Sequence, residues 1–255
     1  MGNFKFGYNF VTIAAIEVDT EDANYPMSNL VLDSNPKRQY RTTVQTQSRI
    51  YYNFGAVAKA VKIVELTDVN FVNILIAGNN TSDWTTPLFP DQAFTISKNI
   101  ETQRYNLCAV LTGFNCQRLR LTIPAQTPLD LSVFRVGSMV CCDTVLELAD
   151  SPAFPYKYSA SEAMKKNEFE SGGEERINLG DLIWRGSFGF DLYAKTAESD
   201  FWILNSVLKH QNIVFFENLG DTSKSYLCRR DSGIEVLWHQ AQLVRTDKIA
   251  LREIR

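Results

Sequence analysis

The sequence predicts a mainly β protein, with an N-terminal β-sandwich followed by a C-terminal α+β unit that packs one helix on an antiparallel sheet. Three observations predict this architecture. Short apolar runs separated by turn residues fill residues 1–145, and residues 146–176 are rich in Pro, Ser, Gly and charge. In residues 177–255, strand-like runs stand on both sides of one helical pattern. We therefore expect a sandwich, a linker or extended arm, and a second folded unit.

The clearest strand of the first region is CQRLRLTIP, residues 116–124. Leu119, Leu121 and Ile123 alternate with Arg118, Arg120 and Thr122, which predicts one buried and one solvated face. The other expected strands are residues 10–18, 49–55, 60–66, 71–78, 93–99, 104–111 and 129–140. About eight short strands at this spacing are typical of a sandwich or jelly roll.

The third region contains one convincing helix, TAESDFWILNSVLKHQ, residues 196–211. Thr196 is the expected N-cap, and Phe201, Leu204 and Leu208 form one apolar stripe. Trp184 and Trp202 are expected to be packing residues. The strands expected around the helix are residues 176–194, 212–219, 225–230, 233–244 and 248–255.

Bulk composition excludes several classes of protein. The chain has 26 Lys and Arg residues against 29 Asp and Glu residues, so it has no general attraction for nucleic acid. No apolar run is long enough to span a membrane as a helix, and residues 1–10 do not resemble a signal peptide. The five cysteines match no zinc-site spacing, and we expect them to be reduced and buried.

Catalytic motifs are missing from the sequence. His210 and His239 stand in no metal-ligand pattern, and no phosphate-binding loop or nucleophile elbow occurs. We therefore expect no catalytic residue, no metal and no cofactor. A hydrolase with an unrecognised site built around His239 or Cys228 remains an alternative, because such sites are recognised by geometry.

Trp84 is the candidate ligand-binding residue, because it stands in the polar loop NNTSDWTTPLFP between two strands. A loop tryptophan can stack on a sugar ring while Asp83 and Asn80 bind its hydroxyl groups. The alternative is that Trp84 plugs the end of the sandwich or packs in a subunit interface.

The stretch YPMSNLVLDSNPKRQYRTT, residues 25–43, forms a polar corner ahead of a strand. With Asn29-Leu30, Asp33, Pro36, Tyr40-Arg41-Thr42 and then Asn53-Phe54-Gly55, it resembles the corner of discoidin-like, galactose-binding jelly rolls. The resemblance implies that the corner caps one end of the sandwich and that Leu30 plugs its mouth. It also implies a second candidate function, a carbohydrate-binding module for host-surface glycans.

The third region resembles the small tail-tube-like domains of tailed-bacteriophage distal and minor tail proteins, since a capped helix is followed by a strand, a polar gap and another strand. This resemblance implies a non-enzymatic virion protein of a phage or prophage tail tip, assembled in the host cytoplasm. Its partners would be other copies in a threefold or sixfold ring and the tail tube, hub and fibres. Residues 146–176 would then clasp a neighbouring subunit.

Overall fold

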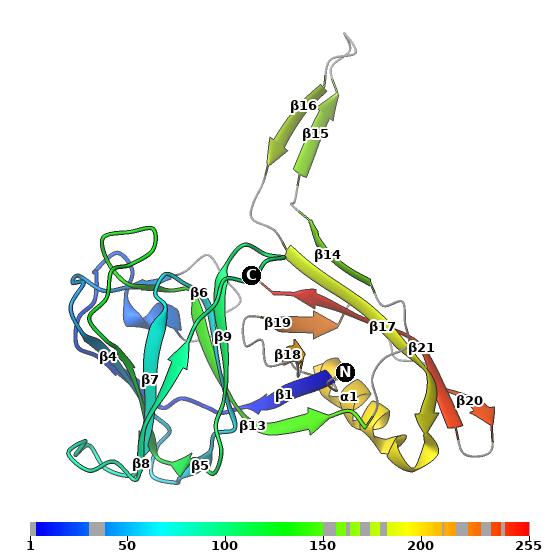
Figure 1. Cartoon of the computed structure of the whole chain (residues 1–255), viewed down its shortest axis with the longest axis horizontal. Coiled ribbons are helices and arrows are strands. Elements are labelled where there is room, and N and C mark those ends of the chain that lie inside the picture. The colour runs from blue at the N-terminus through cyan, green and yellow to red at the C-terminus, as the bar shows by residue number, and fades with distance from the viewer. Residues whose placement is uncertain are drawn as a thin grey trace.

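The computed structural model describes residues 4–30, 39–149, 157–161, 164–168, 174–178, 183–210, 212–217, 224–230, 236–240 and 243–254. Within them the protein is built almost wholly of antiparallel strands with one α-helix, which confirms the predicted fold class (Figure 1). A β-sandwich forms one side of the molecule, and a helix-bearing sheet forms the other.

The outer layer of the sandwich is a five-stranded sheet of order β2-β4-β11-β7-β8. Its strands are Ala15–Val18, Ser48–Asn53, Arg118–Ile123, Asn73–Asn79 and Phe89–Thr95. As the alternation predicted, Leu119, Leu121 and Ile123 are fully buried. Thr122, expected on the solvated face, is also buried.

The inner layer belongs to a ten-stranded sheet of order β14-β17-β21-β19-β18-β1-β13-β6-β9, with β20 paired to β21. On the sandwich side its strands are β1 (Phe4–Phe10), β13 (Ser138–Glu147), β6 (Ile63–Val69) and β9 (Tyr105–Val110). On the other side they are β14 (Lys157–Ser161), β17 (Ile183–Ala194), β18 (Ile213–Glu217), β19 (Ser225–Arg230), β20 (Val236–Gln240) and β21 (Leu243–Glu253).

Strand β1 joins the two halves of the ten-stranded sheet, because it pairs with β13 on one edge and with β18 on the other. Gly7 leaves room for the Ile63 side chain of β6, since a Cβ there would lie 2.6 Å from Ile63 Cδ1. The sheet therefore crosses the expected boundary at residue 145. The division into units 1–145, 146–176 and 177–255 stays a prediction.

Three apolar clusters fill the interior. One lies between the two sandwich sheets, and a second gathers Phe4, Phe6 and Trp184 with the helix of the C-terminal half. A third lies where the halves meet, and it includes Ile63, Cys142 and Phe216. Strand β13 serves two of them, because Cys141 belongs to the first cluster and Cys142 to the third.

Helix α1 spans Ser199–His210 and follows a short 3-10 turn, η2, at Lys195–Ala197. The expected stripe of Phe201, Leu204 and Leu208 is buried, as predicted. The expected N-cap at Thr196 is wrong, since Thr196 lies inside the 3-10 turn.

Of the two tryptophans expected to pack, Trp184 is fully buried and lies against Tyr226 with ring centroids 4.1 Å apart. Trp202 is 51% exposed and its indole N–H bonds to Glu198 Oε1 on the helix surface, so that prediction is wrong.

The predicted arm includes a β-hairpin of β15 (Met164–Glu168) and β16 (Glu174–Asn178). The two strands pair with each other as a separate two-stranded sheet and stand away from the body (Figure 1). We refer to β15 and β16 as the arm.

The corner ahead of β4 begins with η1 (Met27–Leu30) and continues after the undescribed residues 31–38, so Asp33, Pro36 and Arg38 lie outside the described residues. Leu30 is fully buried in the sandwich core, in keeping with its predicted role as a plug. Arg41 stacks on Tyr25, 3.7 Å from the ring centroid. The short strands β3 (Tyr40–Arg41), β5 (Lys59–Ala60), β10 (Asn115–Cys116) and β12 (Arg135–Val136) complete the fold.

Candidate functional site

Trp84 lies over the outer face of the five-stranded sheet and does not plug the sandwich. Its ring covers the Arg120 guanidinium at 4.8 Å and lies 5.8 Å from the Tyr51 ring, centroid to centroid. Arg120 in turn donates to both carboxylate oxygens of Asp91, at 3.0 and 2.9 Å. Because strands β4, β11 and β8 supply these neighbours, the tryptophan rests on a rigid support. We refer to Trp84, Arg120, Tyr51 and Asp91 as the Trp84 ledge.

The loop that carries Trp84 is fixed by Asn79, the last residue of β7. The Asn79 side chain donates to the backbone oxygen of Asp83 and accepts from the backbone N–H groups of Asn80 and Leu88. The loop has no strand partner for its backbone among the described residues, so these side-chain hydrogen bonds satisfy backbone groups there and define the shape of the loop. Asn79 was not among the expected site residues, although an Asn at a strand end ahead of a polar loop is a usable turn signal.

The polar side chains expected to bind sugar hydroxyls are both engaged within the protein. Asp83 Oδ1 accepts from the backbone N–H of Thr85, and hydrogen bonds from Thr85 lower the pKa of the Asp83 carboxyl. Asn80 Oδ1 accepts from the backbone N–H of Gln117. Asn80, Asp83 and Trp84 thus share one loop, and the two polar residues shape it through these bonds.

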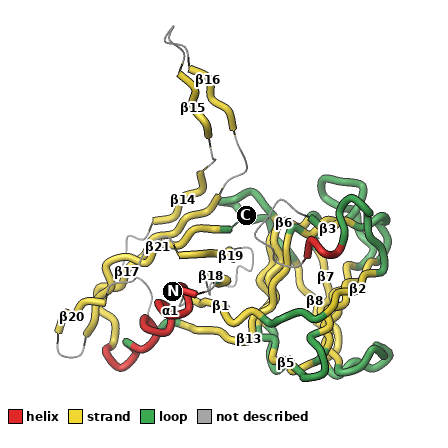
Figure 2. The backbone as a smooth tube through the Cα atoms, turned by 180° about the vertical axis from the view of Figure 1, so that it is seen from behind, coloured by secondary structure: helices red, strands yellow, loops and turns green. Residues whose placement is uncertain are grey.

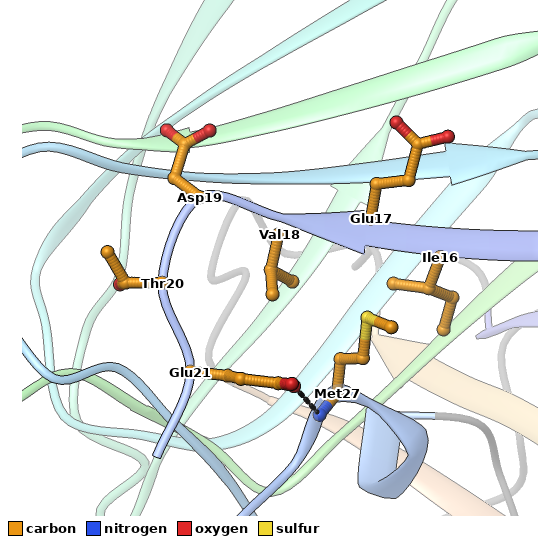
Figure 3. Close-up of a pocket in the computed structure, with 7 residues that line it drawn as sticks. All are labelled: Ile16, Glu17, Val18, Asp19, Thr20, Glu21 and Met27. Carbon is orange, nitrogen blue, oxygen red and sulfur yellow. Dashed lines mark hydrogen bonds between the residues drawn. The ribbon is translucent and has the colours of Figure 1, made fainter. Parts of the chain in front are cut away.

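A groove opens along strand β2, which is the end strand of the five-stranded sheet (Figure 3). Its volume is about 340 Å³, and its lining residues are Ile16, Glu17, Val18, Asp19, Thr20, Glu21 and Met27. Glu21 accepts a hydrogen bond from the backbone N–H of Met27 at 2.9 Å, which holds the turn after β2 against η1. We refer to this feature as the β2 groove.

A buried polar network joins the two halves of the protein. Arg104 donates to both oxygens of Glu253 at 2.8 Å, and Glu253 also accepts from the backbone N–H of Trp184. Glu101 accepts from the Trp184 indole and from the Tyr226 hydroxyl. The bonds of Arg104 and Glu101 cross from the segment around β9 to the C-terminal strands, and the Trp184–Glu253 bond ties β17 to β21, so together they hold the two halves in contact.

Glu65 of β6 is buried in the same region and accepts a 2.9 Å hydrogen bond from Ser225 Oγ of β19. Burial raises the pKa of the Glu65 carboxyl well above its ordinary value, and the Ser225 bond offsets only part of that rise. Glu65 serves as a packed polar contact between β6 and β19.

The hydrolase alternative around His239 or Cys228 stays untested by the described residues. Cys228 is fully buried, and the side chains of His210 and His239 lie outside the described residues. Each of the five cysteines is a buried thiol, as expected, and none forms a disulfide. In the described part of the chain, no three His, Cys, Asp or Glu side chains gather as a metal site, and no helix has the length and apolarity to cross a membrane.

No protein-family model and no curated protein sequence matches this chain. Among solved structures, it is similar to a family 32 carbohydrate-binding module of AlyQ in complex with 4,5-unsaturated mannuronic acid, at 14% identity and a TM-score of 0.42, over 54% of this chain and 100% of that one. The family 32 module of NanJ from C. perfringens, in complex with galactose, has 13% identity and a TM-score of 0.40, over 50% and 91% of the two chains. Reduced XRCC1, from its complex with the DNA polymerase β catalytic domain, has 8% identity and a TM-score of 0.42, over 57% and 100%.

Proposed function

We propose that this protein is a structural subunit of a larger assembly and joins its neighbours through the β15–β16 arm. The arm carries the proposal, because it is a two-stranded hairpin that joins none of the larger sheets. An isolated two-stranded hairpin is marginally stable in water. A second surface would cover the arm in the assembly and supply the missing packing.

The surface of helix α1 supports the same role. Trp202 is 51% exposed and Ile203 is 40% exposed, and they are neighbours on the helix. We propose that these two side chains are covered by a neighbouring subunit in the assembly. The arm and this helix face give the protein two separate places for contact.

The resemblance of the third region to tail-tube-like domains leads us to propose a phage or prophage tail tip as the assembly. In that setting the chain forms part of a ring at the end of the tail tube, and the sandwich serves as an attachment platform. The proposed role is architectural, with no reaction and no cofactor.

Sedimentation velocity of the purified chain tests the assembly role. We expect a multimer for the wild type and a monomer for a variant in which residues 162–180 are replaced by a short Gly-Ser linker. Mass spectrometry and immunogold microscopy of purified virions test the tail-tip location. A wild type that stays monomeric at all concentrations and is missing from virions contradicts the proposal.

Glycan binding at the Trp84 ledge is the second candidate function. Trp84 is partly exposed on a rigid base, and an aromatic ring held in this way needs little ordering when a sugar stacks on it. Trp84→Ala should lower glycan affinity by about 2 kcal/mol if the ledge binds sugar. Leu88→Ala, at an exposed apolar residue of the same loop, is the matched control and should leave glycan affinity unchanged. A glycan array that gives no binding to the wild type removes this candidate.

A further inference from the structure

The β2 groove combines a free sheet edge with apolar and acidic side chains. Strand β2 pairs with β4 on one edge, and no described strand pairs with the other. Ile16, Val18 and Met27 are partly buried against the sandwich core, and Glu17 and Asp19 are exposed. Figure 3 shows the Glu17 and Asp19 carboxylates on the side of the strand opposite Val18. Arg49 already lies 3.8 Å from Asp19, whereas the carboxylates of Glu17, Asp19 and Glu21 outnumber that one cation along the strand. Such an edge can accept one more strand, and its remaining negative charge favours a basic one.

The arm carries the complementary chemistry. Lys165 and Lys166 are in β15, and Arg176 of β16 pairs directly with Lys166. These three cations occupy the half of the hairpin nearer the body, and the acidic residues Glu168, Glu174 and Glu175 occupy the half nearer the turn. Both β15 and β16 have an outer edge that pairs with no other described strand. The arm can therefore extend a sheet with its basic half.

The arm and the β2 groove lie on different sides of the molecule. Figure 2 shows β15 and β16 projecting beyond the ten-stranded sheet, whereas β2 lies at the far side of the sandwich. A contact between them within one chain is ruled out by this separation. A contact between copies would be heterologous, because one surface of each subunit meets a different surface of the next.

We propose that the basic half of the arm docks as an added strand in the β2 groove of a second copy of this chain. This inference rests on the proposed assembly role and names the surface that the arm meets. Backbone hydrogen bonds to β2 give the affinity. Lys166 and Arg176 pair directly across the hairpin and therefore share one face of it, so they supply the positive charge that sets the register against Glu17 and Asp19. The acidic half of the arm then lies beyond the groove, where it avoids like charge.

Charge reversal on each side tests the proposal in the full chain. The arm variant is the double substitution Lys166→Glu and Arg176→Glu, and the groove variant is the double substitution Glu17→Lys and Asp19→Lys. Both are measured by sedimentation velocity. Each double variant alone should associate at least about tenfold more weakly than the wild type, because like charges then meet. An equimolar mixture of the two should assemble again, since each arm then finds a groove of opposite charge.

The matched control is the double substitution Lys59→Glu and Lys62→Glu, which makes the same charge change at two exposed lysines away from the arm. It should assemble as the wild type does, and the urea midpoint of every variant shows whether it is folded. If the wild type assembles and the groove variant assembles equally well, or the mixture fails to recover, the docking proposal is wrong while the assembly role stands. If the wild type itself is a monomer, both are wrong.

Discussion

Removing Arg104 should destabilise the whole protein, because it leaves the Glu253 carboxylate buried without its main counter-charge. The Glu253 side chain is 3% exposed and that of Arg104 is 13% exposed, with both contacts at 2.8 Å. Breaking a buried ion pair from one side costs about 3–5 kcal/mol. Because the Trp184 amide still bonds Glu253, we expect Arg104→Ala to lower the free energy of unfolding by about 3 kcal/mol.

Urea unfolding at pH 7, followed by tryptophan fluorescence, measures this loss in the free energy of unfolding. Lys5→Ala is the control, because Lys5 pairs with Glu147 at 3.0 Å in a far more exposed place, where a pair contributes at most about 1 kcal/mol. The double variant Arg104→Met with Glu253→Met should recover part of the loss, since the buried charge is gone. A loss below about 1 kcal/mol for Arg104→Ala refutes the view that this pair holds the halves together.

Three further outcomes are expected. The raised pKa of Glu65 means that the folded protein keeps a proton that the unfolded chain releases, so the free energy of unfolding falls as pH rises above the ordinary carboxyl range. Glu65→Gln lacks this titration, so its stability relative to the wild type should increase by up to about 1.4 kcal/mol per pH unit. Urea unfolding from about pH 5 to about pH 9 measures the difference. Gly186→Ala should cost about 1–3 kcal/mol, because its Cβ would lie 2.3 Å from the fully buried Trp184 ring; an unchanged melting temperature would show that the ring has room to move. A thiol reagent should leave the folded chain unlabelled and label all five cysteines in denaturant, and rapid labelling without denaturant would contradict their burial.

Local pattern was enough to predict strands β4, β7, β9 and β11 and the buried helix stripe. The strand expected at residues 93–99 was misplaced, since β8 spans Phe89–Thr95, and the strand expected at residues 129–140 was misplaced as well, since β13 spans Ser138–Glu147. The alternation of Leu119, Leu121 and Ile123 depends only on period two, and all three are buried. Strand β1 was missed although its aromatic residues alternate at period two, and its pairing with two distant strands could not be predicted from local pattern. The helix start was misplaced because the chain makes a 3-10 turn first.

The candidate site shows what a single sequence cannot supply. Trp84 was chosen from its loop, but the supporting Tyr51, Arg120 and Asp91 come from three different strands. Strand order decides which residues become neighbours, and no local signal in the sequence encodes that order. The buried contact between the two halves could not be predicted for the same reason, since Arg104 and Glu253 are 149 positions apart.

The contact between the two halves of the protein would set the geometry of the proposed assembly. The arm leaves from the C-terminal half, and the β2 groove belongs to the sandwich, so the angle between the halves sets the offset from one copy to the next. A heterologous contact repeated at one fixed rotation closes into a ring or extends into a helix, and a variable rotation yields neither. Strand β1 and the buried bonds of Arg104 and Glu101 hold this angle constant. Buried polar contacts add little net stability, but they allow few alternative arrangements, which is the property that a repeating subunit needs.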